Sequence, residues 1–210
     1  MKYKAVLLDL DGTLVHTSPE YRYTIVGETL TGLGIKTTND LIDKFWFETS
    51  RDKIIRQDFG LNPEIFWAKY RERDHTELRR KLTWPYNDID FVKELKRIGC
   101  KTGIVTGAPP HIASLEISMI GEENFDCVVI ASESRGIRPK PDAHGIEEAL
   151  RFLNTQNNEA MYIGNAEEDI LAARNANVLD ILLIRGEYKL PEIKPSLKIH
   201  SLYDLREILQ

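Results

Sequence analysis

The 210-residue sequence has only two cysteines, Cys100 and Cys127, and neither has a cysteine or histidine partner at metal-ligand spacing. A disulfide framework is therefore excluded, and we expect both thiols to be reduced and to lie in the core. No apolar run approaches the roughly 18 residues of a membrane span. The first run, Ala5–Leu8, is too short for the hydrophobic part of a signal peptide. We therefore expect a cytoplasmic protein with no membrane partner.

Basic residues are also few, with 28 lysines and arginines against 33 aspartates and glutamates and a formal net charge of −5. A protein that coats nucleic acid normally has the opposite balance, so we expect no nucleic-acid partner. With 42% hydrophobic and 29% charged residues, the chain can bury a substantial core. This composition excludes the disordered and collagen-like classes.

Short, continuous apolar runs recur along the chain, which is typical of strands buried on both faces of a parallel sheet. The runs are at residues 5–8, 103–105, 127–130, 161–163 and 181–184. A segment with helical periodicity precedes the second apolar run and each later run. These segments are residues 88–98, 110–120, 142–153 and 167–175. We expect Asp88 to cap the first of these helices. Strands that alternate with helices predict an α/β fold with a Rossmann-like parallel sheet.

Residues 18–82 break this alternation, because they contain helical patterns and no strand-like run. A helical block between the first two strands predicts an inserted domain. We assign residues 16–82 to this insert, and residues 1–15 and 83–210 to the sheet core. The basic run Arg79–Lys81 fits either a solvated helix face or a contact with an anionic substrate. The aromatic residues of the insert are expected to form its own core: Phe45, Trp46, Phe47, Phe66, Trp67 and Tyr70.

Polar residues follow four of the predicted strands. They are Asp9 and Asp11 after the first, Thr106 and Gly107 after the second, Lys140 in the loop after the third, and residues 164–169 after the fourth. Because ligands collect beyond the carboxyl ends of parallel strands, we expect these side chains to converge at one edge of the sheet. Two carboxylates, a hydroxyl, a lysine and a further acidic loop suit Mg²⁺ bound together with a phosphate group.

The string Asp9-Leu10-Asp11-Gly12-Thr13, followed in order by Thr106, Lys140 and residues 164–169, resembles the four motifs of the haloacid dehalogenase superfamily of phosphohydrolases. The resemblance covers the whole chain. The extended string through Leu14-Val15 is similar to the phosphoglycolate phosphatase and pyrophosphatase branch of that superfamily. The resemblance implies that the helical insert is a C1-type cap.

The resemblance also implies a role for each site residue. Asp9 would be the nucleophile that forms an aspartyl-phosphate intermediate, and Asp11 would be the general acid and then the general base. Gly12 would permit the tight turn that lets both carboxylates reach one cavity. The implied phosphate-binding residues are Thr106, Gly107 and Lys140, and the implied Mg²⁺ ligands are Asp9, Asp11, Asn165 and Asp169.

Two positions depart from the pattern of the superfamily. Asn165 stands where an aspartate usually follows the glycine, and a neutral amide oxygen holds Mg²⁺ less well than a carboxylate. Glu167 and Glu168 either replace the missing charge or are first-turn residues favoured by the helix dipole. His16 stands where many relatives carry another aspartate. It either contacts the leaving group or is a surface residue at the hinge.

Together these residues predict a magnesium-dependent phosphatase that acts on a small phosphorylated metabolite. Two alternatives remain open: a phosphomutase that uses the same intermediate, and a weakly active or non-catalytic binding member, for which Asn165 is the argument. Asp11 disfavours dehalogenation, because the dehalogenases of the superfamily lack this second aspartate. The motifs do not identify the substrate, since specificity lies in side chains of the cap.

Overall fold

The computed structural model describes residues 2–74, 76–189 and 193–209. The chain divides into two compact units. Met1–His16 and Trp84–Gln210 form what we call the core unit, and Thr17–Thr83 form what we call the helical unit. The two passages of the chain from one unit to the other pair with each other as a two-stranded ribbon of β2 (Val15–Thr17) and β3 (Thr83–Pro85). This ribbon cannot be recognised in the sequence, because each strand is only three residues long.

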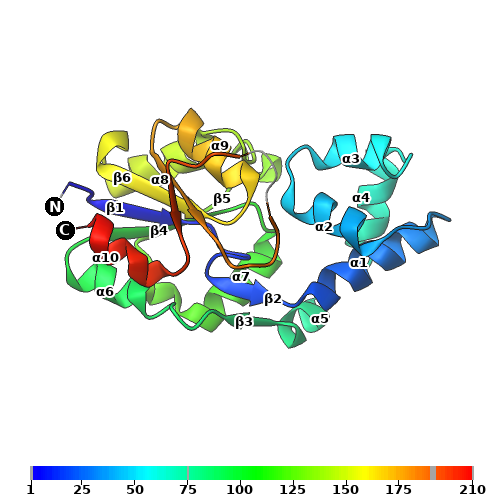
Figure 1. Cartoon of the computed structure of the whole chain (residues 1–210), viewed down its shortest axis with the longest axis horizontal. Helices are drawn as coiled ribbons and strands as arrows, with labels where there is room; N and C mark the ends of the chain where they lie inside the picture. The colour runs from blue at the N-terminus through cyan, green and yellow to red at the C-terminus, as the bar shows by residue number, and fades with distance from the viewer. Residues whose placement is uncertain (1, 75, 190–192, 210) are drawn as a thin grey trace. The chain divides into compact units, whose positions relative to one another are not determined.

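The core unit is built on a parallel sheet (Figure 1). In the described part of the chain its strand order is β5 (Cys127–Ile130), β4 (Lys101–Thr106), β1 (Ala5–Leu8), β6 (Ala160–Gly164), β7 (Leu179–Leu183) and β8 (Leu197–Ile199). β1 lies in the middle and pairs with β4 on one side and β6 on the other. The Rossmann-like parallel sheet is therefore confirmed. β8 is an additional edge strand that the apolar-run pattern missed, because two of its three residues are exposed.

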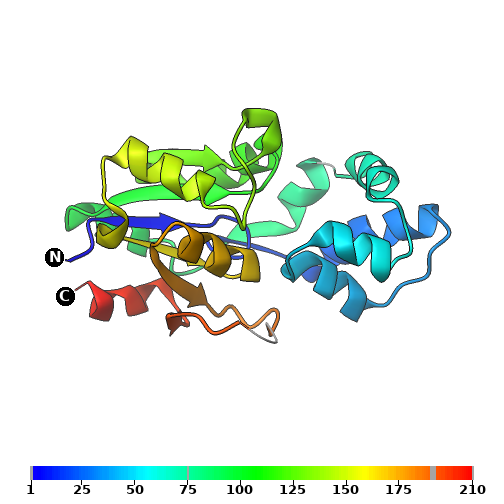
Figure 2. The same cartoon turned by 90° about the horizontal axis from the view of Figure 1, so that it is seen from above.

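Helices cover both faces of this sheet, as Figures 1 and 2 show. Successive side chains of a strand point to opposite faces, so Val6 and Leu8 pack on one side of β1 and Ala5 and Leu7 on the other. The first face is covered by α6 (Phe91–Arg97), α7 (Pro110–Ile120) and α10 (Leu205–Ile208). The second face is covered by α8 (His144–Leu153) and α9 (Glu167–Asn175). All four residues of β1 are fully buried, which explains its continuous apolar run.

The short connections of the core unit include four 3₁₀ turns among the described residues. They are η1 (Glu122–Asn124), η2 (Glu133–Arg135), η3 (Asn157–Glu159) and η4 (Leu202–Asp204). Cys100 and Cys127 are free thiols in the core, as predicted. Burial raises the pKa of the Cys127 thiol to about 11.

The predicted capping role of Asp88 is wrong. α6 begins at Phe91, and the Asp88 carboxylate instead accepts hydrogen bonds from Arg185, Ser201 and the backbone N–H of Leu202. A guanidinium group offers two hydrogen bonds between oppositely charged groups, which together are stronger than one capping bond from an uncharged backbone N–H. A local sequence pattern cannot predict this ion pair, because Arg185 is 97 residues away from Asp88.

The helical unit comprises α1 (Pro19–Gly32), α2 (Asn39–Phe47), α3 (Arg51–Gln57), α4 (Pro63–Arg71) and α5 (Thr76–Lys81). The side chains of Ser18, Thr38 and Asn62 cap α1, α2 and α4, respectively. Buried apolar side chains of this unit, including Phe45 and Phe66, form a separate hydrophobic cluster.

The predicted aromatic core of the insert is confirmed. Phe45 and Phe66 are 2% and 0% exposed, Phe47 is buried, and Trp46, Trp67 and Tyr70 pack against the cluster. In the basic run, Arg79 is not a solvated residue: its side chain is buried over the ring of Tyr21, with 4.7 Å from Cζ to the ring centroid. Arg80 and Lys81 are exposed.

Across the described residues, no helix combines the length and apolar character needed to cross a membrane.

Candidate active site

The site lies at the carboxyl end of β1, where the chain leaves the sheet. The backbone N–H of Asp9 still donates to the carbonyl of Ile163 on β6 at 2.9 Å, which fixes the first carboxylate at the sheet edge. The chain then turns through Gly12, whose φ is +76°. A Cβ atom at this glycine would lie 2.2 Å from the amide nitrogen of Asn165. Gly12 is therefore required both by its backbone conformation and by the close approach of the loop after β6.

Lys140 brings two of the predicted site residues together. Its Nζ lies 2.7 Å from Oδ1 of Asp9 and 2.6 Å from Oδ1 of Asp169. The side chains of Lys140, Asp9 and Asp169 are only 4%, 8% and 0% exposed. The lysine is therefore not the solvated loop residue that an isolated lysine usually is, and one ammonium group bridges two buried carboxylates.

Tyr162 extends this cluster, and the sequence analysis missed it. The tyrosine is fully buried on β6, and its hydroxyl lies 3.2 Å from Oδ1 of Asp169, 3.3 Å from Nζ of Lys140 and 2.9 Å from the carbonyl oxygen of Val105. A buried phenol needs a hydrogen-bond partner. A tyrosine inside an otherwise aliphatic strand was the available signal that polar groups lie beside that strand.

The second oxygen of Asp169 is also engaged. Oδ2 accepts the backbone N–H of Ala166 at 2.9 Å, which ties the first turn of α9 to its own start. Gly164 allows this arrangement, because a Cβ there would lie 2.3 Å from the carboxyl carbon of Asp169. Glu167 and Glu168 lie in the first turn of α9, where acidic residues are favoured by the helix dipole.

Thr13 links the nucleophile candidate to Asn165. Its hydroxyl is fully buried and lies 3.3 Å from Oδ2 of Asp9 and 3.3 Å from Oδ1 of Asn165. One hydroxyl proton serves one of these oxygens at a time. Asp9 and Asn165 therefore present two oxygen atoms to the same small region at the sheet edge.

The electrostatics of the cluster leave negative charge in excess. Burial raises the pKa of Asp9 to about 7, and the nearby Lys140 ammonium opposes this rise. For Lys140, burial alone would lower the pKa, but the carboxylates of Asp169 and Asp9 raise it well above its usual value. One cation thus faces two carboxylates. A group with additional positive charge at this edge would favour the ionised form of Asp9.

Thr106 ends β4, two residues beyond the Ile104 that pairs with Leu8, so it lies at the same edge of the sheet. Its hydroxyl accepts the backbone N–H of Ala108 at 3.1 Å. It does not cap α7, whose N-terminal cap position is Pro109. Gly107 is exposed immediately after the strand.

His16 is partly buried and contacts Glu187 and Tyr86. Among the described residues, no hydrogen bond joins it to the carboxylates of Asp9 or Asp169. Its Nδ1 lies 2.6 Å from Oε1 of Glu187 and 3.3 Å from the hydroxyl of Tyr86, and its ring centroid lies 4.7 Å from that of Trp84. Burial and the neighbouring Glu187 raise the pKa of Tyr86, and the charge of Asp11 adds to this effect. The Asp11 carboxylate is therefore within electrostatic range of the Tyr86 hydroxyl.

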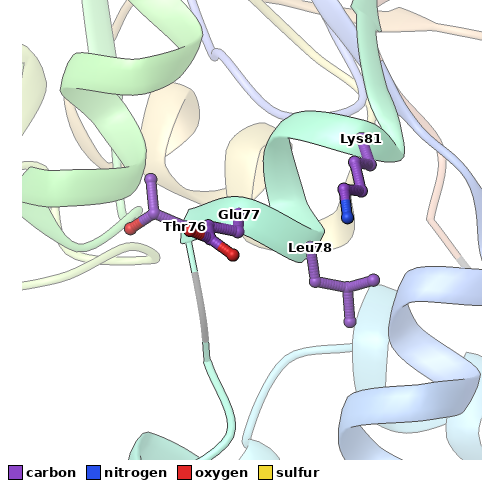
Figure 3. A pocket seen from close by; sticks show the side chains of 4 residues that line it. All are labelled: Thr76, Glu77, Leu78 and Lys81. Carbon is purple, nitrogen blue, oxygen red and sulfur yellow. The ribbon is translucent and has the colours of Figure 1, made fainter.

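The helical unit carries a hollow of about 470 Å³ that is lined by Thr76, Glu77, Leu78 and Lys81 of α5 (Figure 3). None of the predicted site residues lines it. The chemistry-bearing side chains are instead those at the carboxyl edge of the sheet. Among the described residues, no three histidine, cysteine or acidic side chains are placed to hold a metal by themselves.

Replacing Lys140 by methionine is expected to lower the free energy of unfolding by about 3–5 kcal/mol, because it leaves two buried carboxylates without their shared cation. Burial raises the pKa of Asp9 to about 7, and Lys140 opposes this rise, so Asp9 of the variant has a folded-state pKa above its unfolded value. The part of the penalty that comes from Asp9 is therefore larger at pH 8 and declines towards pH 4, where Asp9 takes up a proton. Urea unfolding at both pH values in metal-free buffer measures this difference.

Lys93→Met is the matched control, since Lys93 pairs with Asp90 through side chains that are 63% and 69% exposed. We expect no measurable change in its stability. An Lys140→Met variant as stable at pH 8 as the wild type would contradict the bridging role of Lys140.

Comparison with known proteins identifies the family of the chain. The sequence profile described as haloacid dehalogenase-like hydrolase matches residues 6–182. The chain therefore belongs to the haloacid dehalogenase-like hydrolase family, and the prediction of a hydrolytic enzyme of this family is confirmed.

Relatives and solved structures align over nearly the full length of the chain. Pyrophosphatase PpaX of Halalkalibacterium halodurans is 28% identical over 100% of this chain and 98% of the relative. A predicted phosphoglycolate phosphatase from Haemophilus somnus has a TM-score of 0.79 at 18% identity, covering 100% of this chain and 99% of the other. A family hydrolase from Deinococcus radiodurans, with bound phosphate and sodium, has a TM-score of 0.72 at 16% identity and coverages of 99% and 95%. The structural likenesses show the fold.

Proposed function

We propose that this protein is a magnesium-dependent phosphatase that hydrolyses a small phosphorylated metabolite through an aspartyl-phosphate intermediate. The observation that carries the proposal is the Asp9 carboxylate, which is buried at the end of β1 and held by Lys140 at 2.7 Å. A lysine fixed beside a carboxylate supplies positive charge where a phosphate group would approach. The similarity to PpaX pyrophosphatase supports a substrate with a phosphoryl group.

In the first step, an oxygen of the Asp9 carboxylate attacks phosphorus, and the bond from phosphorus to the leaving oxygen breaks. Asp11 donates its proton to that oxygen, so that the product leaves as an alcohol or as a protonated phosphate. Lys140 remains protonated throughout, because the two neighbouring carboxylates raise its pKa. Thr106 and the amide of Gly107 would donate hydrogen bonds to phosphoryl oxygens.

In the second step, water attacks the phosphorus of the aspartyl phosphate. Asp11, now a carboxylate, accepts a proton from this water, and the bond between phosphorus and the Asp9 oxygen breaks. Inorganic phosphate leaves, and both aspartates return to their starting protonation states. The turn at Gly12 keeps the two carboxylates on one short loop, which allows the same pair to serve both steps.

The residues at the sheet edge fit Mg²⁺, because they offer hard oxygen ligands and carry excess negative charge. Asp9 and Asn165 would hold the ion through the oxygens that both face Thr13. Asp11 and Asp169 are the other two predicted ligands, but both oxygens of Asp169 already accept hydrogen bonds, from Lys140 and from the backbone N–H of Ala166. When bound, Mg²⁺ would neutralise charge between the nucleophile and the phosphate group. Residues 16–82 would form the cap that selects the substrate; in support, the helical unit has its own hydrophobic cluster and contains none of the site residues.

The proposal is tested by assaying phosphate release from a panel of phosphorylated metabolites, pyrophosphate included, with Mg²⁺ and with a chelator. We expect at least one compound to release inorganic phosphate in a metal-dependent manner. Transfer of the phosphoryl group between positions of a sugar bisphosphate, without net release, would instead identify a phosphomutase. Binding of phosphorylated compounds without any turnover would identify a non-catalytic member.

Asn165→Asp is expected to lower the Mg²⁺ concentration needed for half-maximal rate by about tenfold, because a charged oxygen holds this ion better than a neutral one. The substitution is nearly isosteric and leaves Oδ1 beside Thr13. A Mg²⁺ titration of the steady-state rate, in wild type and variant, measures the shift. Asn158→Asp is the control, since Asn158 is exposed in η3, before the start of β6 and at the other end of that strand from Asn165. Unchanged Mg²⁺ dependence in Asn165→Asp would show that residue 165 is not a ligand.

A further inference from the structure

Arg185 lies two residues beyond the end of β7 and is not part of any motif that the sequence analysis singled out. Its side chain is only 8% exposed. The guanidinium group donates to both carboxylate oxygens of Asp88, at 2.8 and 2.9 Å, and its Nη2 also donates to the backbone carbonyl oxygen of Thr13 at 2.6 Å. Its Cζ lies 3.8 Å from the ring centroid of Tyr86. One buried arginine thus joins the turn after β1 to two other segments of the core unit.

Asp88 fixes this guanidinium group in place. Its Oδ2 also accepts the hydroxyl of Ser201 at 3.0 Å and the backbone N–H of Leu202 at 2.8 Å. Burial alone would raise the pKa of Asp88, but the hydrogen bonds from Arg185 and Leu202 hold it below its usual value. The carboxylate is therefore a fixed anion, and the Arg185 group that reaches Thr13 has little freedom to move.

Thr13 connects Arg185 to the proposed nucleophile. The Thr13 carbonyl accepts from Arg185, and the hydroxyl of the same residue lies 3.3 Å from Oδ2 of Asp9. The turn is otherwise held by backbone hydrogen bonds, from Gly12 N–H to Val15 and from Leu14 N–H to Leu10, both at 2.8 Å. Arg185 adds a charged side-chain anchor to the turn that carries Asp9 and Asp11.

A role in stability alone is a weak explanation for this arrangement. A buried ion pair often adds little to stability compared with apolar residues of similar volume. The Nε of Arg185 is buried and has no hydrogen-bond partner among the described residues, which is a further cost. The hydrogen bond from Arg185 to the Thr13 carbonyl is the contact that connects this ion pair to the turn after β1.

We propose that Arg185 is a positioning residue, which holds the Thr13 carbonyl and so fixes the turn that aims Asp9 and Asp11 at the phosphoryl group. The inference rests on the proposed phosphatase function. A displacement of about 1 Å at a reacting group can cost about a hundredfold in rate. The effect of losing this anchor should therefore appear in kcat rather than in substrate binding.

The test compares Arg185→Lys and Arg185→Gln with Arg206→Gln. Arg206 is the matched control, because it also makes a two-pronged bond, to Glu94, and lies over the Phe91 and Tyr203 rings, but on the surface and away from Thr13. Lysine keeps the charge beside Asp88, yet a single nitrogen cannot reproduce the fork that also reaches Thr13. The measurements are kcat and KM for an aryl phosphate with Mg²⁺, urea unfolding, and amide hydrogen exchange of residues 9–16.

We expect Arg185→Gln to lower kcat about a hundredfold and Arg185→Lys to lower it about tenfold, with KM within about threefold of wild type. Exchange should be faster in residues 9–16 and unchanged in α8. Arg206→Gln should keep wild-type kcat and exchange. Should Arg185→Lys fail to fold, Asp88→Asn keeps an acceptor for the guanidinium and should show the same pattern more weakly.

The hydrogen-exchange measurement separates this inference from the proposed function. Wild-type protein that hydrolyses no phosphate compound would overturn the proposed function, and with it a role of Arg185 in that reaction, whatever the exchange shows. Active wild type, together with a folded Arg185→Lys variant of unchanged kcat or unchanged exchange in residues 9–16, would overturn the positioning role alone. Faster exchange spread over the whole core unit would also overturn it, because Arg185 would then be a general stabilising residue.

Discussion

Asp9→Asn is expected to abolish hydrolysis, with a loss on the order of 10⁴-fold or more, because an amide cannot form the aspartyl-phosphate intermediate. The replacement is nearly isosteric. Its Oδ1 can still accept from Lys140, and Lys140 keeps its second partner, Asp169, at 2.6 Å. The fold should therefore be retained. Phosphate release at saturating Mg²⁺ measures the loss, and Asp90→Asn, an exposed change on the same unit, should keep wild-type activity.

The same variant should also change the pH dependence of stability in metal-free buffer. Burial raises the pKa of Asp9 to about 7 in the folded protein, so the ionised carboxylate opposes folding. This opposition is absent at low pH and grows as pH rises from about 4 to about 7. Asp9→Asn removes it, so the variant should gain stability relative to wild type over that range. Activity within tenfold of wild type would contradict the nucleophile assignment, and a pH-independent stability difference would contradict the burial argument.

Asp11→Asn should behave differently from Asp9→Asn, because it removes proton transfer and leaves the nucleophile in place. General acid–base catalysis typically contributes 10²–10⁴-fold. We expect a loss of this size for alkyl phosphates, whose leaving oxygen needs a proton. An activated aryl phosphate should lose much less in the first step, since its leaving group departs as an anion.

The second step of Asp11→Asn should be slow for every substrate, because the attacking water has lost its base. The variant should therefore release one equivalent of aryl alcohol in a burst and then turn over slowly, while the phosphoryl group remains on Asp9. Stopped-flow measurement of the burst, beside steady-state rates for both leaving groups, tests this. Equal loss for both leaving groups, with no burst, would argue against the acid–base role of Asp11.

Much of the core could be predicted from the sequence, because local patterns carry the information. β1 is fully buried and reads as a continuous apolar run, and parallel topology then brings its end near the ends of β4 and β6. Lys140 was predicted at the site, and the structure places its ammonium beside Asp9 and Asp169.

The contacts that sequence patterns missed join residues far apart in the chain. The Tyr162 hydroxyl donates a hydrogen bond to the carbonyl of Val105, and the Arg185 guanidinium group donates to Asp88 and Thr13. Hydrophobic periodicity in the sequence does not predict such contacts, because Tyr162 and Arg185 are single polar side chains in an apolar strand and in a loop. Asp88 shows the resulting error: its local pattern favours a helix cap, whereas a distant guanidinium offers a stronger bond.

The central position of β1 has a consequence for the order in which the protein can be assembled during synthesis. Ala5 pairs with Lys101 on β4 and with Ala160 on β6, so β1 leaves the ribosome well before either of its partner strands. Among the described residues, the buried members of the hydrophobic cluster of the helical unit lie between Val26 and Phe66, and the side chains packed against them lie between Tyr23 and Tyr70. All of its parts exist before β4 has been translated, whereas the sheet cannot close around β1 until β6 has emerged. Nascent chains that end before Lys101 therefore carry the four consecutive apolar residues Ala5–Leu8 without either of the strands that pair with them in the folded sheet.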